Sequence, residues 1–269
     1  MLAVADGLVQ SDEVDKSKRL AGIVILAGGA SKRMGSPKAE LTLPTGERLL
    51  DYHVRQALEL SSAMMSNLPI MIADNGRGFS VHVDLTKKKP QSPIFCIADY
   101  LSANGLCSKK LSDTKLSGKS LSNKDDNSIE TGGALVAIEA ALQALTPQEN
   151  TNNLTKITDT KSSWLLVISC DSLIPVMGLW QKLRPYITQD TDKSVICLTD
   201  DSHLYPLLAL YRLSIEPDLK HYIDNGQRQV MKFIKPIVQT VPFAKVWQEL
   251  TNFNTPKDFV RACLALNDS

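Results

Sequence analysis

Four residues in one short stretch near the start of the chain have the types and spacing to bind an anion: Gly28, Gly29, Arg33 and Lys38. Two adjacent glycines carry no side chain that would keep backbone N–H groups away from a bound anion. Arg33 and Lys38 add two positive charges to the same loop, and such cations form strong hydrogen bonds with phosphate oxygens. The stretch therefore predicts a cradle for a triphosphate.

A second candidate is Asp171, which directly follows the largely apolar run Trp164–Cys170. An aspartate at the carboxyl end of a buried strand is suited to hold Mg²⁺ against nucleotide phosphates, because hard cations prefer oxygen ligands. The alternative is an aspartate that caps a turn or a helix.

Two further polar residues, Asn75 and Asp99, come after the apolar segments at 68–73 and 93–98. Ligands of parallel sheets bind outside the carboxyl ends of the strands, so we expect both side chains beside the glycine loop. For Asp99 the alternative is a helix cap or a turn residue.

These residues need a scaffold of alternating strands and helices. The run Ile23–Leu26 is short, apolar and rich in β-branched residues, which is typical of a buried parallel strand. Leu50, Val54 and Leu58 then follow at helical spacing. Further strands are expected at 68–73, 93–98, 164–170, 195–199 and 205–211, and further helices after Gly133, over 217–224 and from Pro256. This alternation predicts an α/β fold with a mainly parallel sheet.

The loop from Leu26 to Lys38 reads Leu-Ala-Gly-Gly-x-Ser-x-Arg-Met-Gly-x-x-Lys. It has neither the Gly-Lys-Ser/Thr ending of a P-loop nor the Gly-x-Gly-x-x-Gly of dinucleotide-binding folds. The pattern resembles the opening of the nucleotidyltransferases and, within them, of the molybdenum cofactor guanylyltransferases of the MobA type. Relatives that use cytidine or sugar nucleotides more often read Leu-Ala-Ala-Gly, so Gly28 and Gly29 favour the guanylyl branch. The resemblance extends to about Leu266 and implies a Rossmann-like, three-layer nucleotidyltransferase fold.

The resemblance also implies a reaction. Such an enzyme transfers GMP from GTP to the terminal phosphate of molybdenum-bound molybdopterin, which gives the guanine dinucleotide form of the cofactor and pyrophosphate. It implies Mg²⁺ held by Asp171, with Arg33 and Lys38 as the other catalytic residues. Beyond GTP and molybdopterin, it implies molybdoenzyme apoproteins or cofactor-biosynthesis proteins as partners.

Residues that bind the substrates are implied in the same way. Asp99 and Asn75 would contact the guanine nucleotide, and Arg228 with Asn252 and Asn254 would receive the pterin substrate. The full set of implied binding residues is Leu26, Ala27, Gly28, Gly29, Lys38, Asn75, Asp99, Gly133, Arg228, Asn252 and Asn254. For the two asparagines at 252 and 254, a capping role before the helix at Pro256 is the alternative.

Three positions depart from the family pattern and leave the acceptor open. Glu130 lies in a segment that usually reads Gly-Pro-Leu-Ala-Gly, Tyr205 replaces a histidine, and Gln229 replaces an arginine. One alternative is another nucleotidyltransferase that passes CMP to molybdopterin, or a nucleoside monophosphate to a phosphorylated sugar or polyol. The other is a non-catalytic carrier of nucleotide or finished cofactor.

Length and composition set outer bounds on these interpretations. With 269 residues and 43% apolar content, the chain is long enough to bury one sizeable core. A net charge of +1 argues against a general nucleic-acid-binding protein. Neither a membrane-spanning run nor a signal peptide is recognisable, so the sequence favours a cytoplasmic protein with no membrane partner.

The domain organisation predicted from polarity is simple. Residues 1–19 are expected to form a mobile tail, and 20–269 the nucleotidyltransferase domain. Two polar stretches, at about 102–128 and 146–163, exceed ordinary loop lengths and are interpreted as insertions into that domain.

Overall fold

The computed structural model describes residues 19–29, 31, 33–87, 92–101, 133–146, 159–187 and 192–267. Within these residues lies one seven-stranded sheet in the order β3-β2-β1-β4-β6-β5-β7. The strands are β1 (Arg19–Leu26), β2 (Ile70–Ala73), β3 (Ile94–Ile97), β4 (Ser163–Ser169), β5 (Val195–Thr199), β6 (Leu204–Arg212) and β7 (Val238–Pro242).

The sheet is parallel apart from β6, which runs antiparallel to its neighbours β4 and β5. Leu26, the last residue of β1, pairs with Ala73 at the end of β2 and with Ser169 at the end of β4. The three strands therefore end level with one another. The segments that follow them meet at one edge of the sheet, as the sequence predicted.

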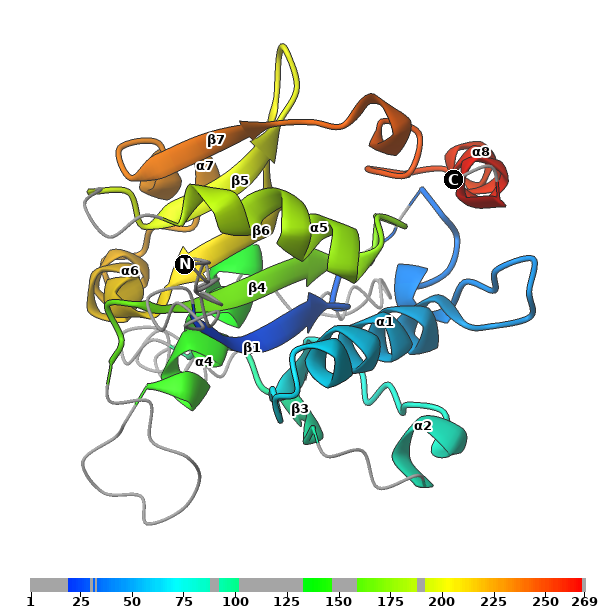
Figure 1. The fold of residues 1–269 in the computed structure, drawn as a ribbon, viewed down its shortest axis with the longest axis horizontal. Helices are drawn as coiled ribbons and strands as arrows, with labels where there is room; N and C mark the ends of the chain where they lie inside the picture. The colour runs from blue at the N-terminus through cyan, green and yellow to red at the C-terminus, as the bar shows by residue number, and fades with distance from the viewer. Residues whose placement is uncertain are drawn as a thin grey trace, which may run out of the picture.

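Helices cover both faces of the sheet (Figure 1). Helices α1 (Leu49–Ala63), α5 (Val176–Leu183) and α8 (Pro256–Asn267) contribute to one buried apolar cluster, and α4 (Ala134–Leu145), α6 (Glu216–Asp224) and α7 (Val230–Ile234) to the other. Along β1, Ile23 and Ile25 belong to the first cluster and Val24 to the second. Since both faces are buried, the strand needs apolar residues at successive positions, and the predicted three-layer α/β architecture is confirmed.

Shorter elements complete the described chain: η1 (Lys38–Glu40), α2 (Val83–Lys87), η2 (Arg184–Tyr186), η3 (Leu213–Ile215) and η4 (Lys245–Trp247). The strands expected from 68 and 93 begin at Ile70 and Ile94, one or two residues later than predicted. The strand predicted over Ile23–Leu26 begins earlier, at Arg19, which was assigned to the tail. The predicted insertion at 102–128, most of that at 146–163 and the tail up to residue 18 lie outside the described residues. None of the described helices has the length and apolar character needed to cross a membrane.

Candidate active site

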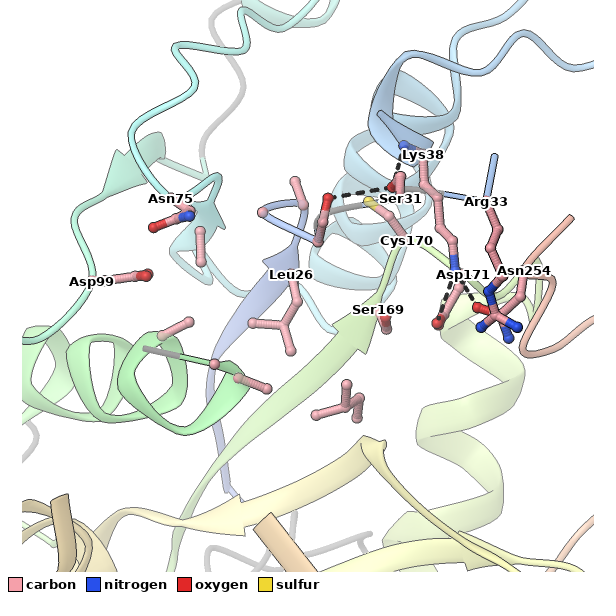
Figure 2. Close-up of a pocket in the computed structure, with 18 residues that line it drawn as sticks. Leu26, Ser31, Arg33, Lys38, Asn75, Asp99, Ser169, Cys170, Asp171 and Asn254 are labelled. Atoms are coloured by element: carbon pink, nitrogen blue, oxygen red, sulfur yellow. Dashed lines mark hydrogen bonds and ion pairs between the residues drawn. The ribbon is translucent and has the colours of Figure 1, made fainter. Parts of the chain in front are cut away.

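A pocket of about 410 Å³ lies at the carboxyl ends of the parallel strands (Figure 2). Its wall comes from the segments after β1, β2, β3 and β4, from the start of α4, and from the loop before α8. The lining residues are Leu26, Ala27, Gly28, Gly29, Ser31, Arg33, Lys38, Ala73, Asn75, Asp99, Gly133, Ala134, Ala137, Ser169, Cys170, Asp171, Leu207 and Asn254.

Most residues predicted from the sequence meet in this pocket. Leu26, Ala27, Gly28, Gly29, Arg33, Lys38, Asn75, Asp99, Gly133, Asp171 and Asn254 all line it, whereas Arg228 and Asn252 do not. Thr131 and Gly132, which precede Gly133 at the predicted helix start, lie outside the described residues.

The glycine loop packs directly against the turn that follows β2. A Cβ atom added to Gly28 would lie 2.7 Å from the Cβ of Asn75 and 3.2 Å from the carbonyl carbon of Asp74. Real Cβ atoms essentially never lie as close to another heavy atom as the 2.7 Å to the Asn75 Cβ, so a larger residue at position 28 would require the loop or the turn to shift. At Gly29 an added Cβ would meet no described atom within 4 Å. The first glycine thus serves close packing, while the second leaves its backbone open to the pocket.

Ser31 closes the loop between the glycines and the lysine. Its hydroxyl donates to the carbonyl oxygen of Gly29 at 3.3 Å and accepts from the backbone N–H of Lys38 at 3.2 Å. Its backbone is in the left-handed region, with φ of 47°. This residue orients the loop, and its place in the loop pattern was the only signal for it in the sequence.

Lys38 is the centre of the polar network in the pocket. Its Nζ lies 3.0 Å from Oδ1 of Asn254 and 3.4 Å from Oδ2 of Asp171, as the dashed lines in Figure 2 show. The ammonium group also lies 5.7 Å from the ring centroid of Phe253, within the range of a cation–π contact. The Lys38 side chain is only 15% exposed and that of Asp171 is 29% exposed, so this charge pair is partly shielded from water.

Asp171 is held by backbone hydrogen bonds on both sides. The N–H of Cys170 donates to the carbonyl oxygen of Leu26 at 3.2 Å, which ties the end of β4 to that of β1. The carbonyl oxygen of Asp171 itself accepts from the N–H of Phe253 at 3.3 Å. The carboxylate is therefore placed by the sheet and by the loop before α8.

Asp171 also meets the chemical requirements for the implied Mg²⁺. Among the described residues, no group of three or more His, Cys, Asp or Glu side chains is placed to hold a metal. Mg²⁺ does not require such a cluster, because in nucleotide sites it is commonly held by one or two carboxylates together with substrate phosphates and water. One carboxylate at the wall of a pocket, beside a cationic loop, fits that pattern.

Asn75 and Asp99 lie at the end of the pocket away from Lys38 and Asp171 (Figure 2). Asn75 has a left-handed backbone with φ of 56°, in a turn where Asp74 accepts hydrogen bonds from the N–H groups of Gly76 and Phe79, both at 3.0 Å. Burial raises the pKa of the Asp99 carboxyl, and the nearby charge of Asp74 raises it further. A hydrogen-bond donor from a ligand would relieve both effects.

Arg228 and Asn252 are engaged elsewhere. Arg228 Nη1 donates to the carbonyl oxygens of Ile223 at 2.6 Å and Gln227 at 2.7 Å, at the end of α6. Asn252 is exposed, with φ of 53°, and accepts hydrogen bonds from the side chain of Asn254. Their assignment to the acceptor substrate stays a prediction.

Several lining residues were not predicted. Ser169 and Cys170 precede Asp171 at the end of β4, Ala134 and Ala137 belong to the first turns of α4, and Leu207 comes from the antiparallel strand β6. Apart from their proximity to Asp171 and Gly133, nothing in the sequence marked them, because small and apolar side chains carry no chemical signature.

Comparisons with known proteins agree with this geometry. The sequence profile of the MobA-like NTP transferase domain matches residues 23–105, which include the glycine loop and Asp99. A molybdenum cofactor guanylyltransferase of Haemophilus influenzae is 27% identical over 113 residues, which cover 41% of this chain and 58% of that protein. The protein of the same name from Photobacterium profundum is 24% identical over 236 residues, covering 87% of this chain and 91% of its own length.

The fold is also similar to a solved structure. Molybdopterin-guanine dinucleotide biosynthesis protein A from Archaeoglobus fulgidus superposes with a TM-score of 0.55 at 17% identity, covering 92% of this chain and all of that one. This likeness shows the nucleotidyltransferase fold that the sequence predicted. The profile match over residues 23–105 and the curated relatives support a MobA-type protein.

Proposed function

We propose that this protein is a Mg²⁺-dependent guanylyltransferase that transfers GMP from GTP to molybdenum-bound molybdopterin. The observation that carries the proposal is the convergence of the glycine loop, Lys38, Asp171 and Asp99 on one pocket. The names of the curated relatives support the same reaction.

The pocket suggests how GTP lies. Guanine presents two adjacent donors, N1–H and the exocyclic amine, and the Asp99 carboxylate is suited to accept from both. The triphosphate would then extend along Gly28 and Gly29 toward Lys38 and Arg33, which lie toward the other end of the pocket (Figure 2). Backbone N–H groups and two cations give this end the charge that a triphosphate requires.

The chemistry needs positioning more than proton transfer. The terminal phosphate of the acceptor is already ionised at neutral pH, so its oxygen attacks the α-phosphorus without a general base. The bond between the α-phosphorus and its bridging oxygen to the β-phosphorus breaks, and pyrophosphate leaves with that oxygen and its electron pair. Lys38 and Arg33 stabilise the negative charge that grows on the leaving group.

Asp171 would hold Mg²⁺ beside the same phosphates. The bound ion supplies charge neutralisation at the nucleotide oxygens. Lys38 lies 3.4 Å from the same carboxylate, so the cationic groups of the pocket are concentrated where pyrophosphate departs.

The acceptor is the least constrained part of the proposal. Tyr205, at one of the positions that depart from the family pattern, donates a hydrogen bond to Asp200 at 2.6 Å and packs on Phe243 with ring centroids 4.8 Å apart. Glu130 lies outside the described residues. Molybdopterin as acceptor and any protein partners therefore follow from the family resemblance, and the cytoplasmic location is predicted from the sequence, in which no membrane-spanning run or signal peptide is recognisable.

A pyrophosphate-release assay tests the proposal. The protein is incubated with each of the four ribonucleoside triphosphates, with and without molybdenum-bound molybdopterin, in Mg²⁺ and in excess chelator. We expect release only with GTP, acceptor and Mg²⁺ together. Release with CTP instead would indicate the cytidylyl alternative, and tight GTP binding without release under any condition would indicate a carrier.

A further inference from the structure

We infer that Asn254 is a positioning residue for Lys38, and that Asn252 sets the orientation of its side-chain amide. The inference builds on the proposed function, since it takes Lys38 to be the triphosphate-binding lysine. It assigns Asn254 to the nucleotide rather than to the acceptor, to which the family resemblance assigned it.

The hydrogen bonds around Asn254 fix which end of its amide faces Lys38. Its Nδ2 donates to the backbone oxygen of Asn252 at 3.0 Å and to Oδ1 of Asn252 at 2.9 Å. Two acceptors on one side require the NH₂ group there, because an amide oxygen has no hydrogen to donate. The oxygen must then point the other way, toward the Lys38 ammonium at 3.0 Å.

The backbone that carries Asn254 is also fixed. Leu173 N–H donates to the carbonyl oxygen of Leu250 at 2.7 Å, and Phe253 N–H donates to that of Asp171 at 3.3 Å. Asp258, in the first turn of α8, accepts hydrogen bonds from the backbone N–H groups of Asn254 at 3.3 Å and Thr255 at 3.0 Å. The amide oxygen is therefore presented from a braced loop and not from a free side chain.

A neutral acceptor has a chemical advantage over a second carboxylate. The contact between Lys38 and Asn254, at 3.0 Å, is shorter than that between Lys38 and Asp171, at 3.4 Å. A carboxylate cancels much of the charge of an ammonium group, whereas an amide oxygen holds it by a single hydrogen bond and leaves the charge available to phosphate. Asn254 thus orients Lys38 without neutralising it.

The first test measures nucleotide binding in the absence of any acceptor. We expect Asn254→Ala to weaken GTP binding roughly tenfold, in line with losing one hydrogen bond to a charged group. Guanosine has no phosphate for Lys38 to bind, so its affinity should change less than about twofold. Asn252→Gly keeps the left-handed backbone and the carbonyl acceptor, so we expect a smaller loss in the same direction. Asn225→Ala, on the exposed end of α6, is the matched control and should leave both affinities unchanged.

A double-mutant cycle and a labelling measurement give independent readouts. Once Lys38→Met has removed the ammonium, adding Asn254→Ala should cost almost nothing further in GTP affinity, because the two residues act through one interaction. In the protein without ligand, the rate at which an acid anhydride modifies Lys38, followed by mass spectrometry, should change in Asn254→Ala and not in Asn225→Ala.

Three outcomes would overturn the inference. These are unchanged GTP affinity in Asn254→Ala with a loss confined to the acceptor's KM, additive effects in the cycle, or an unchanged labelling rate at Lys38. If the parent protein binds no nucleotide, the proposed function fails instead. The labelling rate still tests the contact between Asn254 and Lys38 in that case.

Discussion

The residues predicted to bind the nucleotide and those predicted to bind the acceptor fare differently in the structure. Every predicted nucleotide residue, from Gly28 to Asp171, lines the same pocket. Of the three residues predicted for the acceptor, only Asn254 does, and its side chain contacts Lys38. Arg228, in the loop after α6, donates to the carbonyl oxygen of Ile223 near the end of that helix, and Asn252 accepts from the side chain of Asn254.

The difference follows from how each set is positioned. Gly28, Gly29, Asn75, Asp99 and Asp171 follow closely after parallel strands whose ends are level, so the register of the sheet brings them together. The acceptor residues lie in loops after α6 and before α8, where the chain path depends on local caps and turns. A motif in such a loop carries less information about where its side chains point.

The strongest test of the nucleotide side is Asp171→Asn, which keeps the size of the side chain and removes its charge. If Asp171 holds the metal that neutralises the departing pyrophosphate, its contribution is larger in the transition state than in binding. We expect turnover to fall by about two to three orders of magnitude, with a much smaller change in GTP affinity. Steady-state and binding measurements separate the two effects.

Asp201→Asn, at an exposed position in the turn between β5 and β6, is the control for a changed acidic residue away from the pocket and should behave like the parent. Parent-like turnover in Asp171→Asn would remove the metal-holding role from this carboxylate and leave the nucleotide side without its main electrostatic element.

The next largest effect is expected from Gly28→Ala. The added methyl group would meet the Asn75 Cβ at 2.7 Å, and because Asn75 belongs to a backbone-bonded turn, the glycine loop itself must shift. We expect GTP affinity to fall by roughly tenfold or more, since a displacement of the phosphate-binding backbone removes several contacts at once. Gly29→Ala is the matched control for the packing of the loop and not for GTP affinity, because an added Cβ there meets no described atom but would face the bound triphosphate.

Thermal melting distinguishes the two glycine variants. Gly28→Ala should lower the melting temperature, whereas Gly29→Ala should leave it near that of the parent. Equal melting temperatures would mean that the loop and the turn after β2 separate at little cost, and that the close packing at Gly28 does not fix the loop.

Much of this side of the pocket was predictable from sequence because strand ends and a loop pattern coincide there. Gly28, Lys38, Asp99 and Asp171 each follow an apolar run or belong to the glycine-rich pattern. The rest was not predictable for physical reasons. Leu207 reaches the pocket only because β6 reverses direction between β4 and β5, and nothing in a single apolar run reports strand direction.

We expect Asp99→Asn to have a moderate effect on the preference for GTP over ATP and on the pH dependence of GTP binding. In the proposed complex the charged carboxylate would accept from the two guanine donors. Burial raises its pKa, and the charge of Asp74 raises it further. GTP affinity should therefore weaken as the pH falls through that raised pKa, at a higher pH than an ordinary aspartate would show. Asp99→Asn should reduce the preference for GTP over ATP roughly tenfold and abolish this part of the pH dependence.

Titration of GTP and ATP binding between mildly acidic and neutral pH makes the measurement, with Asp84→Asn on exposed α2 as the control. An unchanged preference for GTP over ATP in Asp99→Asn would place the guanine base elsewhere in the pocket. Asp99 would then no longer account for guanine specificity on the nucleotide side.

The smallest effect is expected from Arg228→Ala, which tests the acceptor side directly. Its guanidinium bonds the carbonyl oxygens of Ile223 and Gln227, so its loss removes a cationic cap from the end of α6, a contribution of about 0.3–1 kcal/mol at an exposed helix terminus. Lys232→Ala, which removes a nearby cation bonded to Gln227 by its side chain, controls for charge alone.

For Arg228→Ala we expect a slightly lower melting temperature. The KM for molybdopterin should change less than about threefold, which corresponds to less than about 1 kcal/mol. A rise of tenfold or more at an unaltered melting temperature would show that Arg228 leaves the helix end to bind the acceptor. The two sides of the pocket would then differ only in when their residues are positioned: before the substrates bind on the nucleotide side, and on binding at the acceptor side.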